Sequence, residues 1–148
     1  MIKLDMKKIN EYVWDDSLSV GYTCIDLHHK KLLLIIKDFA SLLKCSQKEY
    51  SLNIGKVLKE LSDYTKYHFC EEEKIISKYK CPFFEQHAKI HEEFISKINE
   101  NLKILASGDM DAGIEFYNFL GKWLLEHIAA KDHRWSDYVH ENYPNEKF

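Results

Sequence analysis

A histidine and a glutamate stand four residues apart at His68 and Glu72, with apolar residues at helical spacing on both sides. Residues four apart share one face of an α-helix, so the imidazole and the carboxylate would point in the same direction. The flanking apolar positions turn that face toward a core. Because both groups can bind a metal ion, the pair predicts a ligand cluster inside a helical protein.

Five further histidines or carboxylates lie on the apolar faces of neighbouring predicted helices. The complete set of candidate metal ligands is His29, His68, Glu72, His87, His91, His127 and Asp132. Counted from the predicted turns, these residues fall at similar heights, with offsets of up to two residues, or about 3 Å. One buried histidine alone is more often an ordinary core residue. Burying the whole set without a cation would carry a large desolvation cost, which favours a metal centre over a metal-free polar network.

The number of donors indicates what such a centre could do. If both carboxylates and one oxide or hydroxide bridge two octahedral metals, a single coordination position stays open, which suits reversible binding of a small molecule. Imidazole suits iron, zinc, copper and nickel, so the donors alone leave the metal open. Asp132 is the least secure ligand, because it follows His127 by five residues, about 140° around an ideal helix. It reaches the site only from the edge of the face or after a distortion at the helix end.

Four helices must hold these ligands, and the apolar periodicity predicts them at about 23–44, 51–80, 83–106 and 110–132. Pro82 separates the second helix from the third, and Gly108 followed by Asp109 predicts a helix end and the cap of the next helix. Short connections force neighbouring helices to alternate in direction. We therefore expect an all-α, up-down-up-down antiparallel four-helix bundle. Residues 1–22 are expected to form an arm across it, and residues 133–148 a short C-terminal helix or tail.

Composition narrows the class of protein. The chain has 148 residues, 45% hydrophobic and 30% charged, which suits one domain over residues 1–148. A formal charge of −3 gives no basic surface for nucleic acid. The longest apolar run, Leu32 to Ile36, is far below the roughly 20 residues that cross a bilayer, and the N-terminal ten residues lack a signal-peptide core. We expect a cytoplasmic monomer with no membrane partner. The cysteines, which include no CxxC pair, are expected to be reduced thiols: Cys24, Cys45, Cys70 and Cys81.

Taken in order, these motifs resemble the bacterial hemerythrins. The resemblance extends from about Trp14 to Trp135 and rests on four features in sequence. They are the stretch Trp14 to Gly21 with Ile25-Asp26-Leu27-His28-His29, the HxxxE of His68 and Glu72, the HxxxH of His87 and His91, and the HxxxxD of His127 and Asp132. One such motif is weak evidence, whereas all four in order are specific.

The resemblance implies a non-haem di-iron centre that binds O2, with two iron ions joined by an oxo or hydroxo bridge. One iron would be held by His87, His91 and His127. The other, with the open position, would be held by His29 and His68. Glu72 and Asp132 would bridge both irons.

The family also implies which residues surround the site. The O2 pocket would be lined by Leu32, Phe69, Trp123, Leu124 and Ile128. His28 stands where the family usually has glutamine, and we expect it at the boundary or beside the ligands. His133 and His140 are expected on the surface or in the tail.

Three functions fit this reading. The expected one is reversible O2 binding without catalytic turnover, as a carrier, store or local supplier. The alternative is a di-iron oxidase, a peroxidase or a nitric-oxide or O2-responsive protein with the same centre, and the third is a structural zinc bundle. Histidine-rich ligation is less anionic than the glutamate-rich ligation of ferritin-like sites, which favours reversible binding.

Overall fold

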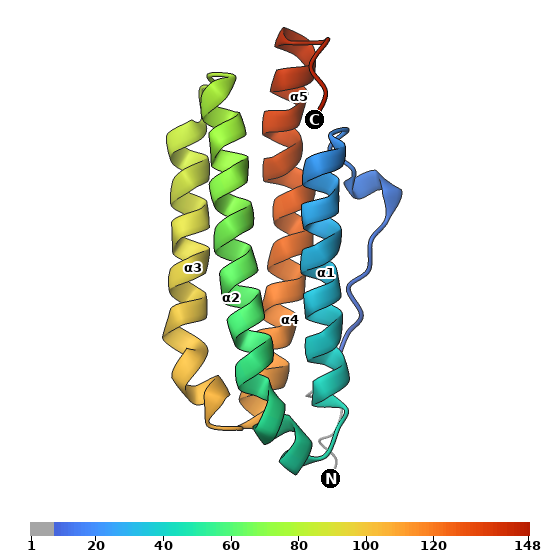
Figure 1. Ribbon diagram of the computed structural model, residues 1–148, viewed down its shortest axis with the longest axis vertical. Coiled ribbons are helices and arrows are strands. Elements are labelled where there is room, and N and C mark those ends of the chain that lie inside the picture. Colours follow the sequence, from blue (N-terminus) through green and yellow to red (C-terminus); the bar gives the residue numbers. More distant parts are fainter. Residues whose placement is uncertain (1–7) are drawn as a thin grey trace.

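The chain folds into long helices that run side by side in alternating directions (Figure 1). The computed structural model describes residues 8–148. The four helices of the bundle are α1 (Thr23–Leu43), α2 (Gln47–Lys78), α3 (Phe84–Ala106) and α4 (Met110–His127). α2 packs against α1 and α3, and α4 packs against α3 and α1, which closes the bundle. The predicted all-α, up-down-up-down bundle is confirmed.

The second helix is longer at its start than predicted, because it begins at Gln47 rather than at 51. The hydroxyl of Ser46 accepts a hydrogen bond from the Glu49 backbone N–H at 3.2 Å and lies 3.4 Å from the Glu49 carboxylate. Ser46 is therefore the N-cap of α2, and its hydroxyl satisfies one backbone donor at the helix start. Residues 47–50, which fall between two predicted helices, therefore belong to α2. At the other end, Lys80 adopts a left-handed φ of 54° in the turn to α3.

The fourth predicted helix, 110–132, is not one regular α-helix. α4 ends at His127, and Ile128–Asp132 form a π-helical turn. The chain then continues in the same direction as α5 (His133–Asn142), so that α4 and α5 form one rod (Figure 1). Of the two forms predicted for the C-terminal segment, residues 133–142 adopt the short helix.

Two apolar clusters fill the interior. The larger cluster includes Leu32 and Phe69, and the smaller one includes Ile25, Ile76 and Trp135. Along α1, His29 lies between Ile25 of the smaller cluster and Leu32 of the larger one. Along the antiparallel α2 the order is reversed, and Glu72 lies between Phe69 of the larger cluster and Ile76 of the smaller one. The candidate ligands therefore occupy a polar layer with apolar packing above and below it.

The N-terminal segment lies along the bundle as an extended arm, as the sequence analysis expected for residues 8–22. Tyr12 donates its hydroxyl hydrogen to Asn118 Oδ1 at 2.9 Å, and the Asn118 amide donates to the Lys8 carbonyl at 2.7 Å. Lys30 lies 4.9 Å from the centre of the Trp14 ring. The part of the predicted arm before residue 8 lies outside the described residues.

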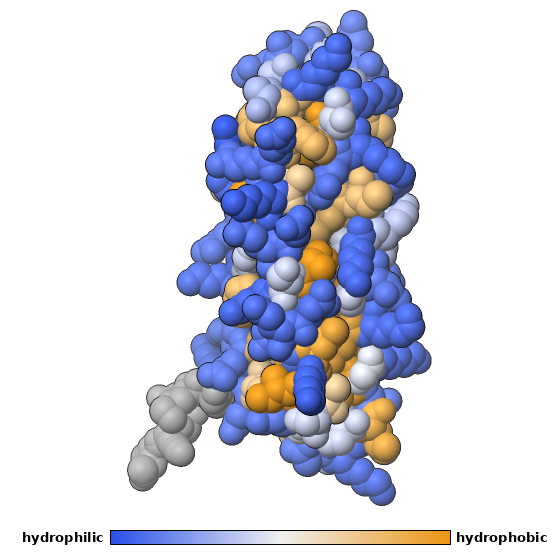
Figure 2. Space-filling model, turned by 90° about the vertical axis from the view of Figure 1, so that its left-hand side faces the viewer, coloured by the Kyte–Doolittle hydropathy of each residue, from blue (hydrophilic) through white to orange (hydrophobic). Residues whose placement is uncertain are grey.

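The surface is mostly polar. On the side that α3 presents, hydrophilic side chains surround smaller apolar patches (Figure 2). Within residues 8–148, no helix is long and apolar enough to cross a membrane.

Candidate metal centre

All of the candidate ligands meet in one buried cluster in the polar layer of the bundle. Every bundle helix and the π-helical turn supply at least one member, and each member is between 0% and 5% exposed. The cluster consists of His29 from α1, His68 and Glu72 from α2, His87 and His91 from α3, His127 from α4 and Asp132 from the turn.

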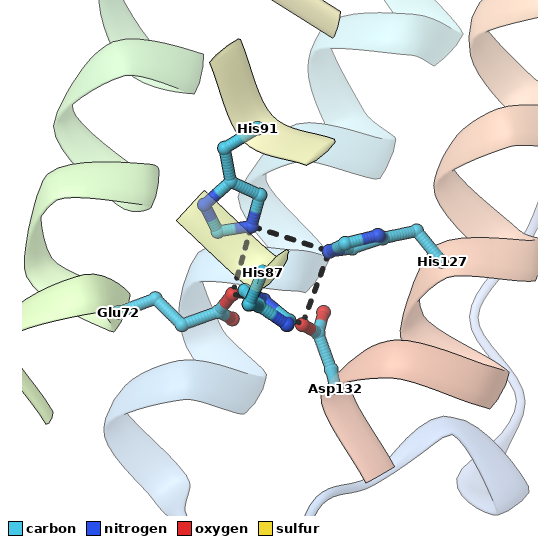
Figure 3. A group of neighbouring side chains, drawn as sticks. All are labelled: Glu72, His87, His91, His127 and Asp132. Atoms are coloured by element: carbon cyan, nitrogen blue, oxygen red, sulfur yellow. Dashed lines mark hydrogen bonds and ion pairs between the residues drawn. The ribbon is translucent and has the colours of Figure 1, made fainter. Parts of the chain in front are cut away.

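One half of the cluster contains three histidines (Figure 3). Glu72 Oε1 lies 2.8 Å from His87 Nε2 and 3.1 Å from His91 Nε2. Asp132 Oδ1 lies 3.2 Å from His127 Nε2 and 3.3 Å from His87 Nε2. The Nε2 atoms of His91 and His127 are 3.2 Å apart. Three imidazole nitrogens and one oxygen from each carboxylate therefore converge, all within 4.8 Å of one another.

The other half contains two histidines. His29 Nε2 lies 3.1 Å from Asp132 Oδ2 and 3.7 Å from Glu72 Oε2. His68 Nε2 lies 3.4 Å from the same oxygen of Glu72. These four side chains also place one ligand atom each within 4.8 Å of the others. Glu72 and Asp132 thus belong to both halves. Glu72 Oε1 and Asp132 Oδ1 face the half with three histidines. Glu72 Oε2 and Asp132 Oδ2 face the half with two.

The π-helical turn explains how Asp132 reaches the cluster. Residues five apart share a face in a π-helix, so Asp132 lies on the same side as His127. The His133 side chain braces this turn, with Nδ1 2.7 Å from the Ile128 carbonyl oxygen and Nε2 3.0 Å from the Ser19 carbonyl oxygen. His133 is half-buried in the C-terminal segment, where the sequence analysis expected a residue of the surface or the tail.

Both carboxylates are ionised despite complete burial. Burial alone would raise the pKa of Glu72, but hydrogen bonds from the surrounding imidazoles hold it well below its ordinary value. The pKa of Asp132 is also lowered, because the adjacent imidazoles outweigh burial and the charge of Glu72. The centre of the cluster is therefore strongly negative unless cations or imidazolium groups balance it.

Two of the imidazoles supply part of that balance in the metal-free chain. Burial alone would lower the pKa of His29, yet the adjacent carboxylates of Asp132 and Glu72 raise it to about 9. The same balance of burial against these two adjacent carboxylates raises the pKa of His87 to about 9. For His68 burial dominates and lowers the pKa. A divalent cation would replace these protons as the positive charge.

Unsatisfied atoms show that the cluster fits metal ions. Both ring nitrogens of His29, Oε2 of Glu72 and both carboxylate oxygens of Asp132 are buried without a hydrogen-bond partner. Buried polar atoms without partners destabilise a fold. Nitrogen and carboxylate donors that converge in this way suit divalent first-row metals, among them iron and zinc.

A small apolar cavity lies about one helical turn from the ligands. Its volume is about 10 Å³, near the smallest size that admits a single water-sized molecule. The wall is apolar apart from one hydroxyl, and is made by Leu32, Ile36, Leu61, Thr65, Phe69, Phe94, Leu120 and Leu124.

Three of the predicted pocket residues, Leu32, Phe69 and Leu124, line this cavity, whereas Trp123 and Ile128 do not. The Trp123 ring instead stacks on the His127 imidazole, with centroids 4.5 Å apart and an interplanar angle of 10°. Ile128 is fully buried in the π-helical turn.

Sequence reasoning missed two hydrogen-bond partners of the candidate ligands. Glu73 Oε2 accepts from His91 Nδ1 at 2.8 Å, and His28 Nδ1 lies 2.9 Å from His68 Nδ1. The sequence contained a signal for the contact of Glu73. Adjacent residues point to different sides of a helix, so Glu73 could not point in the same direction as Glu72. His28 was expected near the ligands without a defined partner.

Comparison with known proteins agrees with this geometry. Residues 20–139 match the family described as "Hemerythrin HHE cation binding domain". The chain is 36% identical over 129 residues to the bacteriohemerythrin of Pseudomonas paraeruginosa, an alignment that covers 86% of this chain and 80% of that protein. It is 30% identical over 127 residues to the bacteriohemerythrin of Stenotrophomonas maltophilia, with the same coverage. The myohemerythrin of Riftia pachyptila is 32% identical over 124 residues, covering 84% of this chain and 90% of that protein.

Proposed function

The chain belongs to the hemerythrin family, and we propose that it binds O2 reversibly at a di-iron centre formed by the buried cluster. Its role would be that of an oxygen carrier, store or local supplier without catalytic turnover. We propose His87, His91 and His127 as the ligands of one iron.

The second iron would take His29 and His68, and Glu72 and Asp132 would be shared by both ions. A bound pair of ferrous ions would supply the electrons that reduce O2 when it binds, and would recover them when O2 is released.

The observation that carries the proposal is the unequal division of the imidazoles around two shared carboxylates. Three histidines share one half of the cluster with one oxygen of each carboxylate, and only two histidines lie in the other half. The two-histidine half therefore offers fewer protein donors, which leaves room for an external ligand. Neutral imidazoles also add no negative charge, and this favours release of O2 over cleavage of its bond.

The protein around the cluster keeps water away from it. Phe69 stacks on His91 with ring centroids 3.7 Å apart and an interplanar angle of 1°, and it also lines the apolar cavity. Leu32 and Leu124 complete the wall close to His29 and His127. A dry, apolar wall disfavours the escape of charged oxygen species and the entry of protons. Glu73 holds the orientation of His91 through its Nδ1 hydrogen.

Metal content combined with optical spectra tests the proposal. Protein produced in iron-replete medium is reduced without oxygen, assayed for iron and zinc, exposed to O2 and then placed under vacuum. We expect about two irons per chain, as the shared-carboxylate geometry supports. A visible absorption band should appear with O2 and disappear under vacuum over repeated cycles.

Other results would assign other functions. Irreversible oxidation after one exposure, or turnover of peroxide, would indicate a di-iron enzyme. Zinc without iron would indicate a structural metal bundle and would overturn the proposal.

A matched pair of variants tests whether iron binding depends on the histidines of the cluster. His29→Ala should lose iron, whereas His140→Gln should keep it, because His140 contacts the Val20 carbonyl oxygen outside the cluster.

A further inference from the structure

His28 makes a direct contact with one candidate ligand from the side away from the metal centre. Its Nδ1 atom lies 2.9 Å from His68 Nδ1. Its ring is held by two aromatic side chains of α2, with centroid distances of 6.0 Å to Tyr64 and 5.4 Å to Tyr67. His28 is only 8% exposed. The ring therefore lies between α1 and α2 with its Nδ1 atom toward His68.

The direction of this hydrogen bond follows from the ligand role of His68. Its Nε2 atom faces Glu72 Oε2 at 3.4 Å, on the side of the cluster. If Nε2 gives its lone pair to a metal ion, the hydrogen of the neutral ring must be on Nδ1, which then donates. His28 Nδ1 has to be the acceptor. The hydrogen of His28 is then on Nε2, which faces the Cys24 sulfur at 4.0 Å.

The three-histidine half has a different kind of acceptor. His91 Nδ1 lies 2.8 Å from Glu73 Oε2, so this ligand donates to a carboxylate. A charged acceptor polarises the imidazole more strongly than a neutral one and makes it a better electron donor to a metal. The two halves therefore differ in the hydrogen-bond acceptors of their histidines as well as in the number of histidines.

We propose that His28 is a positioning residue for His68, which keeps its Nε2 aimed into the cluster and so holds the cation of the two-histidine half. Glu73 does the same for His91 in the three-histidine half. This inference rests on the proposed metal centre, but it does not depend on the proposed reaction with O2.

The test uses Co²⁺ binding to the metal-free full chain, followed by calorimetry and by the visible spectrum. His28→Phe keeps an aromatic ring between Tyr64 and Tyr67 but removes the acceptor, and His28→Gln restores an acceptor through its amide oxygen. We expect His28→Phe to weaken one of two Co²⁺ sites by about 10- to 100-fold, the usual effect of losing such a partner. His28→Gln should stay within about threefold of the parent chain on the same reasoning. Glu73→Ala, which removes the acceptor of the His91 hydrogen, should weaken the other site.

NMR detection of the hydrogen bond distinguishes a variant that loses the orientation of His68 from one that fails to fold. In the Zn²⁺-loaded chain labelled with ¹⁵N, histidine NMR should show a slowly exchanging hydrogen on His68 Nδ1 that exchanges faster in His28→Phe and is retained in His28→Gln. Two tight Co²⁺ sites in His28→Phe, or a hydrogen on His68 Nε2 in the parent chain, would overturn the inference. Failure of the parent chain to bind two Co²⁺ ions would overturn the metal centre and this inference together. Binding of two ions without reversible O2 uptake would contradict only the proposed function.

Discussion

Asp132 Oδ1 lies 3.2 Å from His127 Nε2. The five residues Ile128–Asp132 form one π-helical turn, which follows His127 and ends at Asp132. A π-helical turn is a regular α-helix with one residue inserted. Deleting the exposed Ala130 should therefore restore an α-helix and leave the carboxylate four residues after His127, on the same face, as Glu72 is placed relative to His68. We expect this variant to keep close to the parent's iron content, measured by metal analysis.

The opposite change provides the control for this prediction. One alanine inserted after Ala130 should turn Asp132 and α5 by about 100° and remove the carboxylate from the cluster. Iron content should then fall to that of Asp132→Ala. Loss of iron after the Ala130 deletion, with normal helix content by circular dichroism, would mean that the π geometry itself is required.

Metal loading should release protons in a pH-dependent way. The pKa of His29 and of His87 is raised to about 9 in the metal-free chain, so both imidazoles are protonated at pH 7. Coordination requires the neutral ring, and filling the centre at pH 7 should therefore release about two protons per chain. At pH 10 both rings are already neutral, and the release should be smaller. Zn²⁺ addition with a pH-indicator dye measures this directly, and equal release at both pH values would contradict it.

Local patterns made much of this fold predictable. Apolar spacing locates helices, and Asp109, expected to cap α4, accepts a hydrogen bond from the Ala112 backbone N–H at 3.0 Å. The cap formed by Ser46 and Glu49 is just as local, but its polar residues resembled a loop. The cluster of candidate ligands could be predicted from sequence because antiparallel helices place their residues at heights that can be calculated from the helix lengths.

Other features depend on contacts between distant parts of the chain. The π-helical turn is braced by a contact from His133 to the carbonyl of Ser19, which no local pattern contains. The partner of Glu73 is His91 on another helix, and its identity depends on how far α2 is rotated about its axis. For the same reason, spacing alone left Asp132 at the edge of the site.

The apolar wall should control how long the O2 complex survives. Leu32→Ala and Phe69→Ala enlarge the space beside the cluster and admit water, so the O2 complex should decay several-fold faster while iron content stays unchanged. Leu105→Ala is the matched control, since Leu105 is fully buried at the end of α3 without lining the cavity. All three changes should reduce stability by about 2–5 kcal/mol. Decay rates come from the visible absorbance after mixing with O2, and equal acceleration by the control would remove any special role of the wall.

Gly121 of α4 is the position against which the N-terminal arm packs. A Cβ atom there would lie 2.2 Å from Tyr12 Cδ2, far inside van der Waals contact. Alanine is the better helix former by about 1 kcal/mol, yet Gly121→Ala must displace the Tyr12 ring and break its hydrogen bond to Asn118. We expect the substitution to lower the free energy of unfolding, measured in urea with the metal-free chain. In the Tyr12→Ala background the obstacle is gone, so the same substitution should raise stability by about 1 kcal/mol. A loss of equal size in both backgrounds would show that the glycine serves helix packing rather than the arm.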